Sequence, residues 1–306
     1  VHIDVHKMQP IDSSNVTPQL WTELAHIVQQ NYEKYDGFVV LHGTDTMSYT
    51  ASALSFMFDN LSKPVVFTGS QIPMGIMRTD GRENLITAIE IAAAQRNGYP
   101  IVPEVTLYFQ NRLFRANRTS KLSAEALNAF DSRNYPPLAD VGVNINYNTA
   151  FIHYPEGWFE GTFNPEPLRI TDGFDTNVVI LKIFPGISET TLKAVLSVEG
   201  LRGVILETFG TGNAPTAEWF IELLAQTIQR GVTIVNVTQC VGGGVAMELY
   251  ETGKGLQQVG VLSGYNMTTE AAVTKLMLLL GNSLCVHSPL PCSAFLLFEY
   301  DWYMHF

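Results

Sequence analysis

Short hydrophobic runs alternate along the chain with stretches in which apolar residues recur every three or four positions. The runs are rich in β-branched and aromatic residues, which favours buried strands, whereas the longer spacing indicates helices with one apolar face. We expect strands at 38–41, 64–67 and 104–109, the first of them buried on both faces. Helices are expected from Pro18 with Thr17 as N-cap, over 51–58 and over 80–94. This alternation is typical of βαβ units around a mostly parallel sheet.

From about residue 154 to 175 the periodicity disappears, and Pro, Gly and aromatic residues dominate. Such a stretch is typical of a connection between domains. The alternation then resumes, with strands expected at 178–184, 203–206, 232–237 and 259–262 and a last helix over 269–280. We therefore predict two α/β domains in tandem, 1–155 and 176–306, joined by a connection at 156–175.

Composition excludes several classes of function. Eighteen Lys and Arg against 29 Asp and Glu give a formal net charge of −11 over 306 residues, which disfavours binding to nucleic acid or to an anionic membrane. No apolar run reaches the roughly 18–20 residues of a membrane-spanning helix. Three cysteines cannot form a disulfide framework, and neither cysteines nor histidines have the spacing of metal ligands. We expect no metal site and a reducing compartment.

Polar residues gather where predicted strands end and in neighbouring loops, at 12–14, 43–45, 68–71 and 117–121. Ligands of open α/β sheets bind beyond the carboxyl ends of the strands, so these clusters are the candidates for a site.

Thr44 and Asp45 have two interpretations. In a turn between strand and helix, Thr and Asp ordinarily cap the helix that follows. Alternatively, the Thr44 hydroxyl and the Asp45 carboxylate enter one pocket. A hydroxyl is a weak nucleophile and needs a base beside it; Lys121 would be that base, and Asp45 would hold the lysine in place. Lys121 taken alone is an ordinary surface lysine.

Asp12, Ser13 and Ser14 also have two interpretations. They form a capping cluster ahead of Pro18, or they receive the α-amino and α-carboxyl groups of a free amino acid.

Residues 37–47, Gly-Phe-Val-Val-Leu-His-Gly-Thr-Asp-Thr-Met, resemble the second signature of the bacterial-type L-asparaginases. Further blocks resemble the same family in the same order, at 12–14, 68–73, 80–85, 117–121, 184–187, 209–215, 236–240 and 267–271. The resemblance extends from about Ile11 to Gly281 and is to the cytoplasmic type I members rather than to the periplasmic type II enzymes.

The resemblance implies a larger flavodoxin-like N-terminal domain and a smaller parallel-sheet C-terminal domain. It also implies hydrolysis of L-asparagine to L-aspartate and ammonia, without a cofactor, by a cytoplasmic homodimer or homotetramer.

The resemblance further assigns roles to individual residues. Thr44, Asp45 and Lys121 would be catalytic, and Asp12, Ser13 and Ser14 would hold the substrate's charged ends. The Gly43 and Thr44 backbone N–H groups would face the oxyanion, and Ser70 would lie beside the leaving amide.

Two departures from the family pattern affect these expectations. The family's first signature, Thr-Gly-Gly-Thr-Ile-Gly, carries the threonine that forms the acyl-enzyme, and it has no counterpart in this sequence. We therefore expect the first strand and the nucleophile to be missing, and the chain by itself to be inactive. From about residue 282 the sequence continues through Pro289 and Pro291 into an aromatic tail, where the family has a charged helix.

Two alternative functions stay open. One is an amino-acid-binding or interaction protein that keeps the pocket without the nucleophile. The other is the amidase component of a tRNA-dependent amidotransferase, which the net charge of −11 disfavours.

Overall fold

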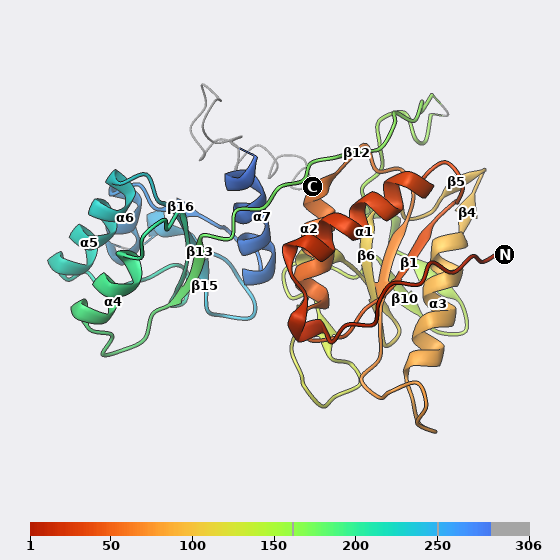
Figure 1. Ribbon diagram of the computed structural model, residues 1–306, viewed down its shortest axis with the longest axis horizontal. Coiled ribbons are helices and arrows are strands. Elements are labelled where there is room, and N and C mark those ends of the chain that lie inside the picture. Colours follow the sequence, from red (N-terminus) through yellow and green to blue (C-terminus); the bar gives the residue numbers. More distant parts are fainter. Residues whose placement is uncertain (161, 250, 283–306) are drawn as a thin grey trace. The chain divides into compact units, whose positions relative to one another are not determined.

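The computed structural model describes residues 1–160, 162–249 and 251–282, and the chain divides into two compact units. The first unit is Val1–Thr171 and the second begins at Asp172. Each contains a sheet with helices packed against it (Figure 1), so the prediction of two α/β units is confirmed. The atypical tail, beyond Asn282, lies outside the described residues.

The first unit is built on a six-stranded sheet with the order β1-β3-β6-β7-β10-β11. These strands are β1 (Phe38–Leu41), β3 (Val65–Thr68), β6 (Val105–Phe109), β7 (Arg112–Arg115), β10 (Ala139–Val141) and β11 (Ile145–Tyr147). The first three are parallel and the last three join antiparallel, so this sheet is only half parallel. Gln110 and Asn111, both with positive φ, form the two-residue turn between β6 and β7.

Helices cover the sheet of the first unit on both faces. All four residues of β3 are therefore buried. Helix α3 (Gly81–Ala93) packs Ala88 and Ile91 against Val66 and Tyr108. Neighbouring residues of a strand face opposite sides, and α2 (Met47–Met57) contacts β3 and β6. Helix α1 (Pro18–Asn31) packs on α2 and begins where predicted, with Thr17 at the N-cap position.

Strand β1 differs from the expectation of a strand buried on both faces. It stands at the end of the strand order, three of its residues are half-buried, and Leu41 is 64% exposed. An edge strand has a neighbour on one side only, which explains why an apolar run is exposed here.

The stretch predicted to connect the domains packs largely on the first unit. Trp158 lies against Tyr99 and Phe163, with ring centroids 5.1 and 4.8 Å apart. Strand β12 (Arg169–Ile170) pairs with β2 (Phe58–Asp59).

The second unit holds a parallel sheet with the order β13-β14-β15-β16. Its elements are β13 (Val178–Lys182), α4 (Glu189–Leu196), β14 (Gly203–Thr208), α5 (Glu218–Gln229), β15 (Thr233–Thr238), α6 (Glu251–Gln258), β16 (Leu262–Ser263) and α7 (Thr269–Gly281). Leu192, Phe220, Leu224 and Leu256 pack one core cluster against the sheet. The strand expected at 259–262 is wrong in extent, since β16 begins only at Leu262.

Short elements complete the described chain: β4 (Gln95–Arg96), β5 (Tyr99–Pro100), β8 (Ser120–Lys121), β9 (Phe130–Asp131), and the 3₁₀ turns η1 (Ser13–Asn15), η2 (Ala116–Arg118), η3 (Thr149–Phe151) and η4 (Met247–Leu249).

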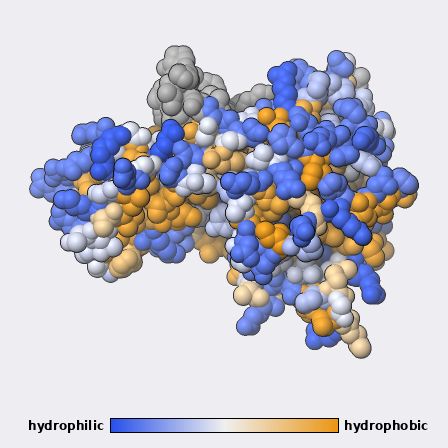
Figure 2. Space-filling model, in the orientation of Figure 1, coloured by the Kyte–Doolittle hydropathy of each residue, from blue (hydrophilic) through white to orange (hydrophobic). Residues whose placement is uncertain are grey.

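No helix among the described residues is both long enough and apolar enough to span a membrane. Apolar and hydrophilic areas are interspersed on the visible surface (Figure 2), and exposed apolar side chains include Met74, Ile76 and Met77 between β3 and α3.

Candidate active site

The carboxyl ends of β1 and β3 bring two polar loops together. The strands are parallel neighbours, with Leu41 opposite Thr68, so residues 42–46 and 69–72 leave the sheet at the same edge. His42 N donates to the Thr68 carbonyl oxygen at 2.9 Å and continues the pairing by one residue. The loops therefore start from a common, fixed position.

Lys121 joins this edge from β8 and contacts two of the residues singled out in the sequence. Its Nζ donates to Thr44 Oγ1 at 2.8 Å and to Asp45 Oδ1 at 2.7 Å. The lysine side chain is 17% exposed, whereas that of Asp45 is 66% exposed. The hydroxyl, the carboxylate and the amine form one cluster, although 77 residues of sequence separate Thr44 from Lys121.

The capping interpretation of Thr44 and Asp45 does not describe this turn. The N-cap residue of α2 is Thr46, and no side chain caps the helix there. Thr46 Oγ1 donates instead to the Ser13 carbonyl oxygen at 2.7 Å. The side chains of Thr44 and Asp45 are thus available for the cluster with Lys121.

Gln71 lies in a candidate stretch of the sequence, 68–71, but sequence reasoning gave it no role of its own. Thr44 Oγ1 donates to its Oε1 at 3.0 Å, and its Nε2 donates to the carbonyl oxygens of Ala124 and Ala126 at 3.2 and 3.1 Å. The hydroxyl proton of Thr44 therefore points to Gln71, while Lys121 donates to the oxygen. The only signal in the sequence was its place beside Ser70 at the end of a strand.

A buried carboxylate, that of Asp80, fixes the backbone of the Gln71 loop by hydrogen bonds. Asp80 is 5% exposed and accepts hydrogen bonds from the N–H groups of Gln71 and Ile72 at 3.0–3.1 Å. Asn84 Nδ2 donates to Asp80 Oδ2 at 3.2 Å and to the Gly69 carbonyl oxygen at 3.0 Å. The sequence had marked Asp80 as the start of a helix and of a block that resembles the family, but without a role, because a pattern cannot show which backbone groups a side chain meets.

The segment of Asp12, Ser13 and Ser14 lies against the Thr44 loop. A Cβ on Gly43 would stand 2.7 Å from Ser13 Oγ, so only glycine permits this approach. Asp12 Oδ1 accepts from Ser14 N and Ser14 Oγ at 2.9 and 2.7 Å, and these two bonds lower the pKa of Asp12 below its ordinary value. The segment is therefore a local cap, of η1, and also a neighbour of the site.

Three further groups are available for a ligand at this edge. Within the described chain, the N–H groups of Gly43 and Thr44 donate to no other protein group, and the half-buried Ser70 hydroxyl makes no hydrogen bond. Ser70 lies close against the first residue of α3, since a Cβ on Gly81 would stand 2.9 Å from the Ser70 Cβ.

His42 links this loop to the helices. Its Nδ1 lies 2.7 Å from the Gly43 carbonyl oxygen, and its Nε2 lies 2.9 Å from Thr50 Oγ1, which accepts from Trp21 Nε1 at 3.1 Å. Burial lowers the pKa of His42, opposed by the bond to Gly43, so we expect a neutral ring. A carbonyl oxygen only accepts, so Nδ1 carries the hydrogen and Thr50 donates to Nε2.

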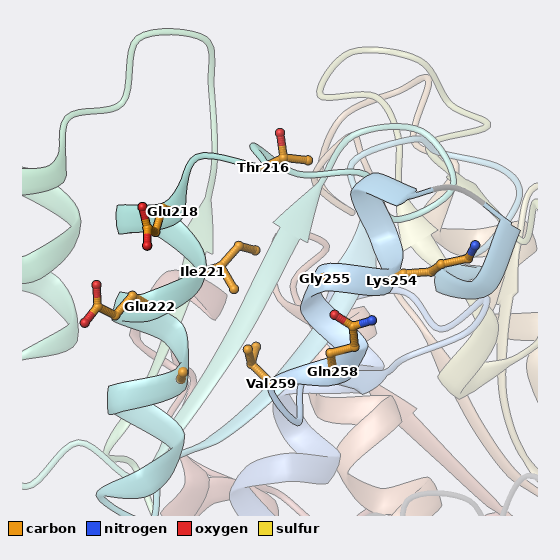
Figure 3. A pocket seen from close by; sticks show the side chains of 9 residues that line it. Thr216, Glu218, Ile221, Glu222, Lys254, Gly255, Gln258 and Val259 are labelled. Atoms are coloured by element: carbon orange, nitrogen blue, oxygen red, sulfur yellow. The ribbon is translucent and has the colours of Figure 1, made fainter.

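The second unit has a shallow groove between α5 and α6 (Figure 3). Glu218, Ile221 and Glu222 line it from α5, and Lys254 and Gln258 from α6. None of the residues predicted to form the site lies in this groove. Nor does any part of the described chain gather three or more His, Cys, Asp or Glu residues that could hold a metal ion.

Comparison with known proteins agrees with this fold. Residues 1–153 match the family described as Asparaginase, N-terminal, and residues 177–287 match the Glutaminase/Asparaginase C-terminal domain. The chain therefore belongs to the asparaginase family, and the predicted resemblance is confirmed.

Individual relatives define the subclass. The chain is 44% identical to L-asparaginase 1 of Escherichia coli K12 over 92% of its own length and 79% of that protein. The crystal structure of L-asparaginase I from Vibrio cholerae superposes with a TM-score of 0.78 at 44% identity, over 88% of this chain and 77% of that one. A glutamyl-tRNA(Gln) amidotransferase chain of Archaeoglobus fulgidus is more distant, at 33% identity over 92% of this chain and 65% of that protein. The similarity is thus to type I asparaginases.

Proposed function

We propose that this protein hydrolyses the side-chain amide of L-asparagine to give L-aspartate and ammonia. The observation that carries the proposal is the contact of the Lys121 amine with both the Thr44 hydroxyl and the Asp45 carboxylate, at 2.8 and 2.7 Å. Such a set can move a proton to or from an attacking oxygen, because the amine is in direct contact with the hydroxyl and is held by the carboxylate. Membership in the asparaginase family supports the same reaction.

Each group of the site has a proposed role in amide hydrolysis. Lys121, oriented by Asp45, would act on Thr44 as a base in its neutral form, with the Thr44 hydroxyl turned from Gln71 towards Nζ, and so prepare the attack or activate the water. The N–H groups of Gly43 and Thr44 stabilise the oxyanion, where a fixed donor contributes roughly 2.7–4 kcal/mol. Ser70 lies beside the leaving amide. The family's acyl-forming threonine belongs to a signature with no counterpart among these 306 residues.

Substrate binding is proposed for the segment that lies on the Gly43 loop. Asp12 is ionised at neutral pH, as an aspartate ordinarily is, so it can pair with the α-ammonium group of asparagine. Ser13 would donate to the α-carboxylate, and Ser14, whose hydroxyl donates to Asp12, would exchange that bond for one to the α-carboxylate. We further infer from the likeness to type I members that the protein works as a homodimer or homotetramer in the cytoplasm, without a cofactor.

The proposal is tested by measuring ammonia release from L-asparagine and L-glutamine. Two forms should be assayed in parallel, the 306-residue chain and the same chain preceded by a Thr-Gly-Gly-Thr segment of the type I family. Activity in the extended form alone supports the proposal with an upstream nucleophile, and activity in both supports it with Thr44 as the first candidate nucleophile.

Two results would overturn the proposal. Binding of asparagine without ammonia release in either form would support an amino-acid-binding protein instead. Release of ammonia only in the presence of a charged tRNA would support the amidotransferase component, which the net charge of −11 disfavours.

A further inference from the structure

The peptide group between Gly43 and Thr44 has a donor without a partner in the described chain and an anchored acceptor. In a trans peptide the C=O and N–H bonds point in nearly opposite directions within one plane. The Gly43 carbonyl oxygen accepts from His42 Nδ1 at 2.7 Å. The Thr44 N–H on the other side of the same plane has no partner within the described chain.

Glycine makes this plane easy to turn. Rotation of the plane needs only the ψ angle of Gly43 and the φ angle of Thr44, and glycine adopts a wide range of backbone angles at little cost. Gly43 is required there because Ser13 lies so close that a Cβ would stand 2.7–2.8 Å from its Oγ and Cβ atoms. The close approach of Ser13 therefore forces a flexible residue into the loop that supplies the oxyanion donor.

We propose that His42 is a positioning residue that fixes the Gly43–Thr44 peptide through the Nδ1–H bond to the Gly43 carbonyl, so that the Thr44 N–H points at the reacting amide carbonyl. The inference rests on the proposed function, since it gives that N–H a task. His42 does not touch the substrate in this account and acts only through the peptide.

The surroundings of His42 make it a rigid anchor. Thr50 on α2 contacts Nε2 at 2.9 Å and is itself held by Trp21 on α1 at 3.1 Å. The ring also lies 6.2 Å from the ring of Phe67 on β3, measured between centroids. One ring nitrogen is thus bonded to the loop residue Gly43 and the other to helix α2, and Nδ1–H is the tautomer that satisfies both.

Two amide substitutions separate positioning from simple packing. In H42N the shorter side chain places its NH₂ group near the former Nδ1, where it can donate to the Gly43 carbonyl. In H42Q the longer side chain reaches the former Nε2 and Thr50 instead. A packing role predicts that H42Q, which fills more of the ring's volume, is the milder change.

The positioning role predicts the opposite order in the active form of the protein. H42N should keep kcat for L-asparagine within about threefold, whereas H42Q and H42A should lower kcat by about 10- to 100-fold with KM changed less than about twofold. That loss stays below the 10²–10³-fold cost of deleting an oxyanion donor, because a misoriented donor is present part of the time. Equal losses in H42N and H42Q, or a larger loss in H42N, would overturn the inference.

An NMR measurement tests the inference without relying on catalysis. With ¹⁵N-labelled protein, the wild-type ring should show a protonated Nδ1, and the Thr44 amide signal should stay in place in H42N but shift or broaden in H42Q. An unperturbed Thr44 amide in both variants would refute the anchor. If neither the 306-residue chain nor the extended form releases ammonia, the proposed function fails, while this comparison still decides whether His42 orients the peptide.

Discussion

Replacing Lys121 by methionine removes the amine that contacts both Thr44 and Asp45, while the similar length of methionine preserves most of the packing. Two hydrogen bonds are lost, at 2.8 and 2.7 Å. Positioned proton transfer contributes about 10²–10⁴-fold to rates, which equals about 2.7–5.4 kcal/mol of transition-state stabilisation. We therefore expect kcat for L-asparagine to fall by about 10²–10⁴-fold in K121M.

The same substitution should leave the fold nearly unchanged. Asp45 is 66% exposed, so its carboxylate stays hydrated after the lysine is gone. Exposed ion pairs contribute about 0–1 kcal/mol, and we expect the free energy of unfolding to fall by no more than that. The separation of a large kinetic effect from a small stability effect is the signature of a catalytic residue.

Initial rates of ammonia release and urea unfolding curves, measured on the same preparations, test both expectations. The exposed Lys34, whose amine lies 3.5 Å from Asn31 Oδ1, supplies the control variant K34M. Loss of less than about tenfold in K121M, or an equal loss in K34M, would refute the role given to Lys121. So would a K121M protein that fails to fold.

Three further expectations concern the supporting structure. Asp80→Asn should lower the free energy of unfolding by about 1–3 kcal/mol in urea titrations and should also reduce kcat. An amide NH₂ group would then face the N–H groups of Gln71 and Ile72, which now donate hydrogen bonds to the carboxylate. Unchanged values of both quantities would contradict this expectation. Ser52→Ala should leave the free energy of unfolding unchanged or raise it, since the buried Ser52 hydroxyl has no partner among the described residues. Thr68→Val should lower it by about 1–2 kcal/mol, because Thr68 donates to the Tyr108 carbonyl oxygen. The reverse order in thermal melts would be inconsistent with the described hydrogen bonds. Burial lowers the pKa of His42 and of His153 below 6.5, so the unfolded state binds protons before the folded state does as the pH falls. The stability contributed by the two neutral rings is therefore full above pH 6.5 and should be lost as the pH falls through their folded pKa values. A decline as steep in H42N as in wild type would exclude a contribution from His42.

The elements predicted correctly are those in which the local sequence favours only one type of secondary structure. Strands β1, β3 and β6 are short apolar runs with no helical spacing, and Pro18 and Thr17 mark the start of α1. The hairpin from β6 to β7 was missed because its turn is Gln-Asn rather than the usual Asn-Gly, and because β7 begins and ends in arginine. Exposure of β1 depends on its place in the sheet, which a run of four residues cannot show.

The site shows the same division. Thr44 and Asp45 were recognisable as candidates, but the local pattern alone favoured helix capping, and only the fold brings Lys121 to them across 77 residues. Gln71, Asp80 and His42 lie in stretches that the sequence marked, but they received no individual role because their roles depend on which groups lie next to them. A hydrogen bond between distant segments leaves no spacing in the sequence.

The most direct test of the central claim is the stoichiometry of the reaction with L-asparagine. Ammonia and L-aspartate should appear in a one-to-one ratio in the form of the protein that is active, and both should be lost together in K121M. Asparagine that is bound and recovered unchanged from both the 306-residue chain and the extended form would contradict the account.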